Sequence, residues 1–378
     1  MAIAPVKKFR VLVVDDSAFM RKVLESIFNA DELLQVVGHA KDGREAIALA
    51  DSLKPDVITM DLNMPHMDGL QATAQIMTSN PRPIVIVSSE SKEGAASTLK
   101  ALELGAIDFV TKPNSGIDLD MQSVREDLLR KVRVAAKVRV VRTASRLANA
   151  VQHPQGTPGG APKPVTPARV SSPAPTSSDL RFPVVVLAAS TGGPATVMRL
   201  APGFTKDFPA AVVLVQHMPA AFTSQYAVQL AEFTGIRVKE AEANEAIQPG
   251  TFYICPGGQH MRVSPTGRVQ LDNTTGRIEG YLPNIDVTME SVAAYAGAMS
   301  IGVVLTGMGS DGARGSRAIN NAGGLVLAQD EATSVIFGMP AEAIKAGVVD
   351  QVLGIDDIYS AIEKRVLGLS RLAPVGAR

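Results

Sequence analysis

The sequence of 378 residues contains no tryptophan and a single cysteine, and aromatic residues make up only 4% of it. Cys255 alone cannot form a disulfide within the chain or supply a multi-cysteine zinc site, and it fits a reducing compartment. The few aromatic residues disfavour a stacking surface for bases, and a net charge of zero disfavours a dedicated nucleic-acid binder. No apolar run approaches the roughly 18 residues of a membrane helix, and Met1 to Phe9 shows no secretory signal. We therefore expect a cytoplasmic protein without nucleic-acid binding or membrane insertion.

Hydrophobic residues make up 46% of the chain, which is enough for a packed core, but bulky apolar residues nearly vanish in residues 153–178. That stretch consists mainly of Pro, Gly, Ser, Thr and Ala and predicts a flexible linker, because it cannot bury enough surface to offset its ordering entropy. We expect a first domain at 8–130, a helical extension and Pro-rich linker at 131–181, and a second domain at 182–370.

Short apolar runs alternate with helical patterns in both halves of the chain, which predicts α/β domains built on parallel sheets. In the first half, five runs predict a doubly wound sheet: Phe9–Val14, Gln35–Gly38, Asp56–Met60, Pro83–Val87 and Ile107–Val110. In the second half, the predicted strands are Val184–Ala189, Ala211–Gln216, Thr251–Cys255, Ser300–Thr306 and Gly324–Ala328. The stretch Met121 to Arg146 predicts one long helix rich in basic residues, which form either a solvated face or a docking surface.

Acidic residues follow two of the predicted strands in the first domain. Asp15 and Asp16 come after the first strand and Asp61 ends the third, so all three meet at the carboxyl edge of the sheet. Single aspartates in such places are usually helix caps, but three together favour an oxygen-binding cation such as Mg²⁺. With Ser88 and Lys112 at neighbouring strand ends, the pattern predicts phosphoryl transfer to Asp61.

Residues 9–130 resemble the receiver domain of bacterial response regulators. The segments that carry the resemblance are VLVVDDS, DVITMDLNMPHMDG, IVIVSS and LGAIDFVTKP. The resemblance implies that Asp61 is the phospho-acceptor, that Asp16 and Asp61 help to hold Mg²⁺, and that Ser88 and Lys112 contact the phosphoryl group. It also implies a histidine kinase as the phosphodonor.

The second domain opens with a buried strand that runs directly into Ser190, two glycines and a proline. A strand, a tight turn and a helix in that order expose a hydroxyl at the sheet edge beside the helix amides. The pattern differs from G-x-S-x-G because Ala188 stands at the first glycine position. A phosphate-binding loop and a plain helix cap therefore remain alternatives.

A serine nucleophile needs a base and a carboxylate that orients it. His217 ends another predicted strand and is the preferred base, with His260 as the second choice. Asp311 follows the strand IGVVLT and is the preferred carboxylate, ahead of Asp286 and Asp330. The glycines around Met308 allow backbone amides to approach a developing oxyanion.

Residues 182–368 resemble the catalytic domain of the CheB family of chemotaxis protein-glutamate methylesterases, through AASTGGP, VQHMP, VLTGMGSDG and AQDEATSVIFGMPAEAI. The resemblance implies Ser190 as nucleophile, His217 as general base and Asp311 as its orienter, with support from Thr191, which orients the histidine, and from the Met308 amide. It implies no cofactor in this domain and methyl-accepting chemotaxis receptors as partners. The segment YLPNIDVTMESVA departs from the family pattern at Leu282, Asn284, Thr288 and Met289, which points to a changed substrate surface.

The two resemblances together imply a hydrolase of glutamate γ-methyl esters, and of glutamine amides, whose receiver blocks the active site until it is phosphorylated. The alternative is a receiver-controlled docking module without catalysis. A DNA-binding output domain is disfavoured, because no helix-turn-helix pattern or basic recognition helix is present.

Overall fold

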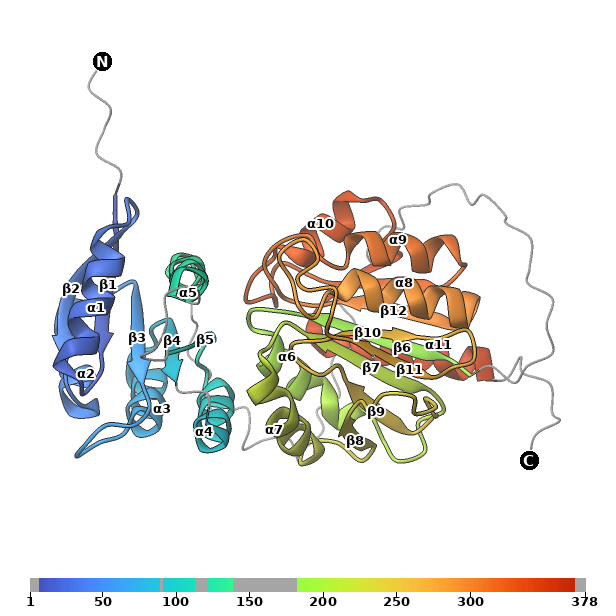
Figure 1. Ribbon diagram of the computed structural model, residues 1–378, viewed down its shortest axis with the longest axis horizontal. Helices are drawn as coiled ribbons and strands as arrows, with labels where there is room; N and C mark the ends of the chain where they lie inside the picture. Colours follow the sequence, from blue (N-terminus) through green and yellow to red (C-terminus); the bar gives the residue numbers. More distant parts are fainter. Residues whose placement is uncertain (1–6, 89–90, 113–120, 139–181, 371–378) are drawn as a thin grey trace, which may run out of the picture.

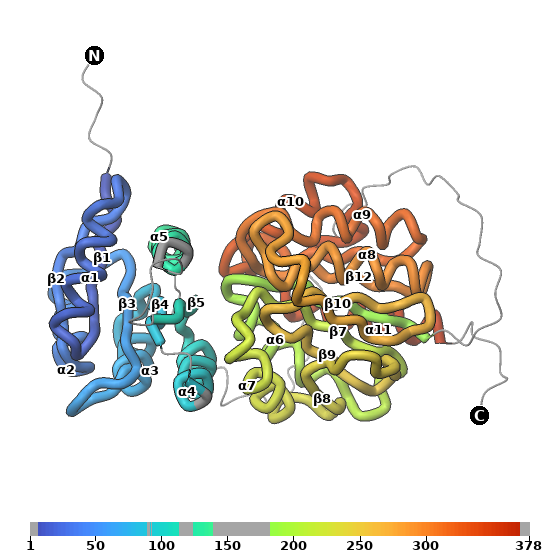
Figure 2. Tube along the Cα trace, in the orientation of Figure 1, coloured from blue at the N-terminus to red at the C-terminus, as the bar shows by residue number. Residues whose placement is uncertain are grey.

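The structure is a computed structural model that describes residues 7–88, 91–112, 121–138 and 182–370. The described residues form two α/β units, and Figure 1 shows them side by side. Figure 2 follows the chain from the first unit, coloured blue to green, into the second, coloured green to red. The two α/β domains expected from the sequence are therefore confirmed, whereas most of the expected linker lies outside the described residues.

The first unit is a five-stranded sheet in the order β2-β1-β3-β4-β5, and all of its strand pairs are parallel. Its strands are β1 (Phe9–Val14), β2 (Leu34–Ala40), β3 (Val57–Asp61), β4 (Ile84–Ser88) and β5 (Asp108–Thr111). Its helices are α1 (Ala18–Asn29), α2 (Gly43–Leu53), α3 (Gly69–Ser79), α4 (Lys92–Glu103) and α5 (Met121–Ala135).

Helices cover both faces of this sheet because its central strands are apolar on both sides. Successive side chains of β1 point to opposite faces, so Val11 and Val13 pack with α1 and α5, whereas Leu12 and Val14 pack with α2, α3 and α4. The arrangement is the doubly wound sheet that the alternating pattern predicted. It places the ends of β1, β3, β4 and β5 along one edge.

The second unit is a seven-stranded parallel sheet in the order β14-β13-β12-β6-β7-β9-β8, with a separate β10-β11 hairpin. Its strands are β6 (Val184–Ala189), β7 (Ala211–Gln216), β8 (Arg237–Glu240), β9 (Thr251–Ile254), β10 (His260–Val263), β11 (Val269–Asp272), β12 (Ser300–Val304), β13 (Leu325–Gln329) and β14 (Gln351–Leu353). Its α-helices are α6 (Gly193–Leu200), α7 (Ala220–Ala231), α8 (Ile285–Ala296), α9 (Ala313–Asn321), α10 (Met339–Lys345) and α11 (Ile355–Ser370). Strand β6 lies between β12 and β7, and this order positions the site described below.

Two expectations about secondary structure need correction. The strands β8, β10, β11 and β14 have three or four residues each and were not expected, because most of them carry polar residues and no long apolar run. The helix expected over Met121 to Arg146 ends at Ala135, and residues 139–146 of that expectation lie outside the described residues. No described helix combines the length and the apolar character that a membrane span requires.

The first unit packs against the second through α4, β5 and α5. Helix α4 lies against α7, where Gln229 donates a hydrogen bond of 3.2 Å to Glu103. The rings of Phe109 in β5 and Phe222 in α7 are in contact, with centroids 4.3 Å apart. One apolar core therefore runs from the α2–α4 face of the first sheet into the α6–α7 face of the second.

Candidate active site

Ser190 lies at the carboxyl end of β6, the central strand of its sheet. Its backbone N–H donates to Thr306 O at 3.1 Å, which ties the serine to the segment after β12. Gly192 continues the turn with a φ of 76°, and a Cβ there would lie 2.6 Å from Val335. A positive φ and a close neighbour both require glycine at this position. The turn thus presents the serine hydroxyl at the sheet edge, as the sequence predicted.

His217 follows β7, the parallel neighbour of β6, and therefore arrives at the same edge. Its backbone N–H donates to Ala189 O at 3.1 Å. Its side-chain Nδ1 lies 3.1 Å from Ser190 Oγ, which is within hydrogen-bond reach for proton transfer. The pair therefore meets the geometric requirement for a nucleophile and its base.

Asp311 follows β12, the other neighbour of β6, and is 1% exposed. Its Oδ2 lies 2.8 Å from His217 Nε2 and also accepts from Ile285 N at 2.8 Å. The carboxylate keeps the Nε2 proton on the ring, which leaves Nδ1 free to accept the serine proton. This ring orientation is opposite to that of the chymotrypsin-type triad, where Nε2 faces the serine.

Asp286 is a second buried carboxylate beside the triad, and it is 2% exposed. Its Oδ1 accepts from Gly312 N and Gly315 N at 2.9 and 2.7 Å, while its own N–H donates to Asp311 Oδ1 at 2.9 Å. Asp286 therefore binds amides at the start of α9, and Asp311 binds amides at the start of α8. Burial raises the pKa of Asp286 to about 6, and the like charge of Asp311 adds to the effect.

The loop that carries Met308 passes directly against the serine. A Cβ at Gly307 would lie 2.8 Å from Ser190 Cβ, so only glycine lets the loop approach this closely. Within the described residues, the Met308 amide donates to no acceptor. The loop therefore brings an available N–H to the neighbourhood of Ser190, as an oxyanion site requires.

Thr191 makes a different contact from the one implied by the family resemblance. Its hydroxyl donates to Asp108 Oδ2 of the first unit at 2.6 Å, rather than to His217. Asp108 is in turn 3.3 Å from Lys131 Nζ. In this arrangement Thr191 links the serine turn to the neighbouring domain.

The structure also brings in Tyr281, which sequence reasoning did not select. Its ring stacks on the imidazole of His217, with centroids 4.4 Å apart and planes inclined by 12°. Tyr281 is the first residue of the segment YLPNIDVTMESVA, which departs from the family pattern at Leu282. Nothing in the local sequence indicates the contact, because it depends on how a distant loop folds back.

The other candidates for base and orienter have structural contacts elsewhere. His260 is fully buried, with Nε2 bonded to Gly276 O at 2.7 Å and Nδ1 accepting from Asn284 N at 3.1 Å. Asp330 accepts from Thr333 N at 2.9 Å. Neither side chain takes part in the hydrogen-bonded series of Ser190, His217 and Asp311.

The acidic residues of the first unit also converge. Asp15, Asp16 and Asp61 each place a carboxylate oxygen within 4.8 Å of the other two. Lys112 Nζ lies 2.9 Å from Asp15 and 2.8 Å from Asp61. Burial raises the pKa of Asp61, a rise that Asp15 adds to and Lys112 opposes. Closely spaced oxygen ligands of this kind suit a hard divalent cation.

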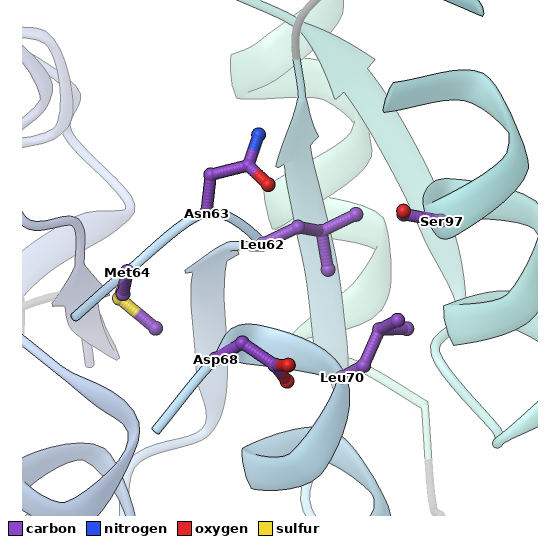
Figure 3. A pocket seen from close by; sticks show the side chains of 6 residues that line it. All are labelled: Leu62, Asn63, Met64, Asp68, Leu70 and Ser97. Atoms are coloured by element: carbon purple, nitrogen blue, oxygen red, sulfur yellow. The ribbon is translucent and has the colours of Figure 1, made fainter. Parts of the chain in front are cut away.

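Ser88 ends β4 beside this cluster, and its hydroxyl is 3.3 Å from Gly94 O. The backbone N–H of Lys112 donates to Ser88 O at 2.7 Å, so the two residues expected to contact a phosphoryl group are neighbours. A pocket lies between the loop after β3 and α4, and none of the site residues expected from the sequence lines it. It is lined by Leu62, Asn63, Met64, Asp68, Leu70 and Ser97 (Figure 3).

Two family models match the chain. The model described as CheB methylesterase matches residues 185–362, and the model described as response regulator receiver domain matches residues 11–123. Both matches fall on the units that the sequence resemblances indicated.

Relatives match over nearly the whole length. A protein-glutamate methylesterase/protein-glutamine glutaminase of Pyrococcus horikoshii is 42% identical over 364 residues, which cover 95% of this chain and 94% of the relative. A second one, from Nitratidesulfovibrio vulgaris, is 43% identical over 376 residues, covering 93% of this chain and 98% of the relative. The crystal structure of the Thermotoga maritima CheB methylesterase catalytic domain is 38% identical, covers 49% of this chain and 99% of its own, and has a TM-score of 0.47.

Proposed function

The chain belongs to the CheB methylesterase family, and we propose that Ser190, His217 and Asp311 carry its catalytic reaction. As a family member with a receiver domain, the chain is a protein-glutamate methylesterase and protein-glutamine glutaminase. The observation that carries the residue assignment is the series of hydrogen bonds from Ser190 Oγ to His217 at 3.1 Å and from His217 to Asp311 at 2.8 Å. The intact series argues against a docking module without catalysis.

The reaction begins when Ser190 Oγ attacks the carbonyl carbon of a glutamate γ-methyl ester and His217 Nδ1 takes the hydroxyl proton. Asp311 stabilises the imidazolium through Nε2, and backbone amides near Met308 and Ser190 stabilise the oxyanion. The C–O bond to the methyl oxygen then breaks, and methanol leaves with the proton from His217. Water, deprotonated by the same ring, then attacks the acyl carbon. The C–O bond to Ser190 breaks, the serine oxygen takes the proton back from His217, and glutamate is released. With glutamine, the C–N bond breaks and ammonia leaves instead.

The receiver site would accept a phosphoryl group on Asp61 from a phosphohistidine of a histidine kinase. An Asp61 oxygen attacks phosphorus as the P–N bond to the kinase histidine breaks. Asp15, Asp16 and Asp61 would hold Mg²⁺, which would supply positive charge to balance that of the phosphoryl group. Lys112 and Ser88 would contact the phosphoryl oxygens once the group is attached, which is supported by the ion pair of Lys112 with Asp61 and by its backbone bond to Ser88.

Control by the receiver has a physical basis in how the two units pack. Ser190 is 6% exposed, and the β5 residue Asp108 bonds the adjacent Thr191. A receptor helix needs access to the serine, so this packed state is the inactive one in our proposal. Phosphorylation of Asp61 would shift the population toward a state in which α4, β5 and α5 no longer cover the site.

The remaining parts of the proposal concern partners, location and boundaries. We propose methyl-accepting chemotaxis receptors as substrates, a chemotaxis histidine kinase as phosphodonor, and a cytoplasmic location that suits the lone Cys255. We also propose a receiver at 8–130, a connecting segment at 131–181 and a catalytic domain at 182–370. Helix α5 crosses the first of these boundaries.

The catalytic assignment is tested with Ser190→Ala in the full chain, by methanol release from a methylated receptor. We expect a loss on the order of 10⁴-fold or more, as for other triad nucleophiles. Ser370→Ala is the matched control, because among the described residues that hydroxyl bonds Val366 O alone, at the end of α11, and the change should leave the rate unaltered. Wild-type methanol release from Ser190→Ala would overturn the assignment.

A further inference from the structure

The catalytic imidazole has a third contact besides its two hydrogen bonds. The Tyr281 ring lies on one face of the His217 ring, at 4.4 Å between centroids and 12° between planes. The bonds to Ser190 and Asp311 direct the two nitrogens within the plane of the ring, whereas a stacked neighbour restrains the tilt of that plane. The phenol ring also covers that face of the imidazole.

The loop that carries Tyr281 is held at both ends. Ile278 and Tyr281 exchange backbone hydrogen bonds of 3.0 and 2.9 Å. The buried His260 ring bonds Gly276 O before this pair and Asn284 N after it, at 2.7 and 3.1 Å. These bonds use backbone atoms of the loop, so they position Tyr281 whatever its side chain is.

The far end of the phenol also has a defined place. A Cβ at Gly309 would lie 2.1 Å from Tyr281 Oη, so glycine at this position makes room for the hydroxyl. Gly309 has a φ of 95° and follows Met308 directly. Burial raises the pKa of Tyr281, so the ring stays neutral at ordinary pH. Tyr281 therefore spans from the catalytic base to the loop that carries the proposed oxyanion amide.

The chemistry gives this contact a role. His217 becomes positively charged when it takes the serine proton, and the face of a neutral aromatic ring attracts a cation. Asp311, Glu279 and Arg130 of the receiver act on the Tyr281 ring. Asp286 lies beside Asp311, and Arg314 donates to Glu279 at 2.7 Å. Of these groups, the positive Arg130 disfavours a further positive charge nearby. An aromatic face that favours the imidazolium without adding a charge would lower the barrier of the acylation step.

We infer that Tyr281 is a positioning residue that holds the plane of the His217 ring and stabilises its protonated form by stacking. This inference rests on the proposed role of His217 as general base. The proposed role requires the aromatic ring and not the hydroxyl. Tyr281→Phe should therefore keep the wild-type behaviour, whereas Tyr281→Leu should lose it.

The test compares Tyr281→Leu with Tyr281→Phe in the full chain, with a small-molecule phosphodonor present and methanol release as the readout. A cation–π contact of this kind predicts that Tyr281→Leu lowers kcat about 3- to 30-fold with little change in KM. The acid limb of its kcat/KM profile moves to lower pH. Tyr281→Phe keeps the wild-type kcat and profile. If Tyr281→Leu does not fold, Tyr281→Met serves the same comparison.

A second readout does not depend on ester hydrolysis. In ¹⁵N-histidine-labelled protein, with His217→Gln to assign the signals, the titration midpoint of the His217 ring should move to lower pH in Tyr281→Leu only. If Ser190→Ala shows that the catalytic assignment is wrong, this titration still reports on the stack. If Tyr281→Leu changes neither kcat nor the titration of the ring, the inference is overturned. A raised KM with unchanged kcat also overturns it, because that result would mean that Tyr281 contacts the substrate instead.

Discussion

Buried carboxylates at the catalytic site have two tasks at once. Asp311 bonds His217 and also the amides of Ile285 and Asp286, and the Asp286 side chain bonds amides at the start of α9. Asp311 thus accepts from the N-terminal amides of α8, the helix that contains Asp286. Asp286 in turn accepts from amides at the start of α9, the helix that follows Asp311. The orientation of the imidazole therefore depends on the same bonds that join α8 to α9.

Asp311→Asn tests this dual role. An amide offers one acceptor oxygen where the carboxylate offers two, so it cannot serve His217 and both backbone amides equally. We expect kcat to fall by a factor on the order of 10³ to 10⁴, with a smaller change in KM and a lower melting temperature. Steady-state kinetics and thermal unfolding measure the two effects. A kcat within ten-fold of wild type would contradict the assignment of Asp311 as orienter.

Asp286 should make stability depend on pH in a defined direction. Its folded-state pKa is raised from 3.8 to about 6, so between these values the folded chain keeps a proton that the unfolded chain has lost. The contribution of Asp286 to the free energy of unfolding therefore falls as pH rises from about 4 to about 6 and stays low above that.

Asp286→Asn removes this titration while keeping an oxygen that can accept from Gly312 and Gly315. Relative to wild type, the variant should gain stability between pH 4 and 7, with an upper limit of about 3 kcal/mol. Chemical unfolding at a series of pH values provides the measurement. A difference between the two proteins that does not change with pH would show that Asp286 does not titrate in this range.

At the scale of elements, the turn between β6 and α6 determines where the nucleophile lies. Gln216 Nε2 donates to Ser190 O at 2.9 Å, and Gly193 N donates to the same oxygen at 2.8 Å. A Cβ at Gly193 would lie 2.2 Å from Gln216 Oε1 and 2.8 Å from Ala189 Cβ. The close approach of helix and strand, and with it the place of Ser190, requires glycine.

Gly193→Ala should therefore displace Gln216 and the serine turn. We expect a loss of about 1 to 3 kcal/mol in stability, typical of overpacking, and at least a ten-fold lower kcat. Gly368→Ala in α11 is the control, because a Cβ there meets no atom within 4 Å and should leave activity unchanged. Wild-type kcat in Gly193→Ala would show that the turn tolerates a side chain and does not set the position of Ser190.

At the scale of the whole molecule, the two domains are joined by an apolar contact and a polar contact, both made by β5. Phe109 of β5 lies 4.3 Å from Phe222, and Lys131 Nζ lies 5.1 Å from the centre of the Phe109 ring. Asp108, the preceding residue, bonds Thr191. Strand β5 also leads to Lys112, which bonds Asp61, so the proposed phosphorylation site and the interface are joined by one short strand.

Phe109→Leu should weaken the packed state while it keeps an apolar side chain. Loss of an aromatic pair worth about 0.5 to 1.5 kcal/mol predicts a roughly 2- to 10-fold rise in methanol release without a phosphodonor. Activity with the phosphodonor should match that of wild type. Ile76→Val, in α3 on the receiver side that faces neither α5 nor the second domain, controls for general destabilisation. Equal basal activity in Phe109→Leu and wild type would argue against control through this contact.

The local sequence was sufficient to select the three side chains that the structure brings together, and their catalytic role stays a proposal. Ser190, His217 and Asp311 each come soon after an apolar run, and parallel strands place such positions at one edge. The short strands were harder to predict: β8, with the sequence RVKE, has no apolar run and exists because it pairs with β9 at the edge of the sheet. Backbone pairing with a neighbour decides such a strand, and a single sequence does not encode it locally.

By itself, the sequence determined the α/β class, the two domains and the residues offered for catalysis, because apolar periodicity and glycine turns act over a few residues. Only the tertiary structure decided the strand order β12-β6-β7, which places His217 and Asp311 on either side of Ser190. It also decided the stack of Tyr281 on His217 and the bond from Thr191 to Asp108. These contacts join residues far apart in the chain, and their existence depends on how whole elements and domains pack.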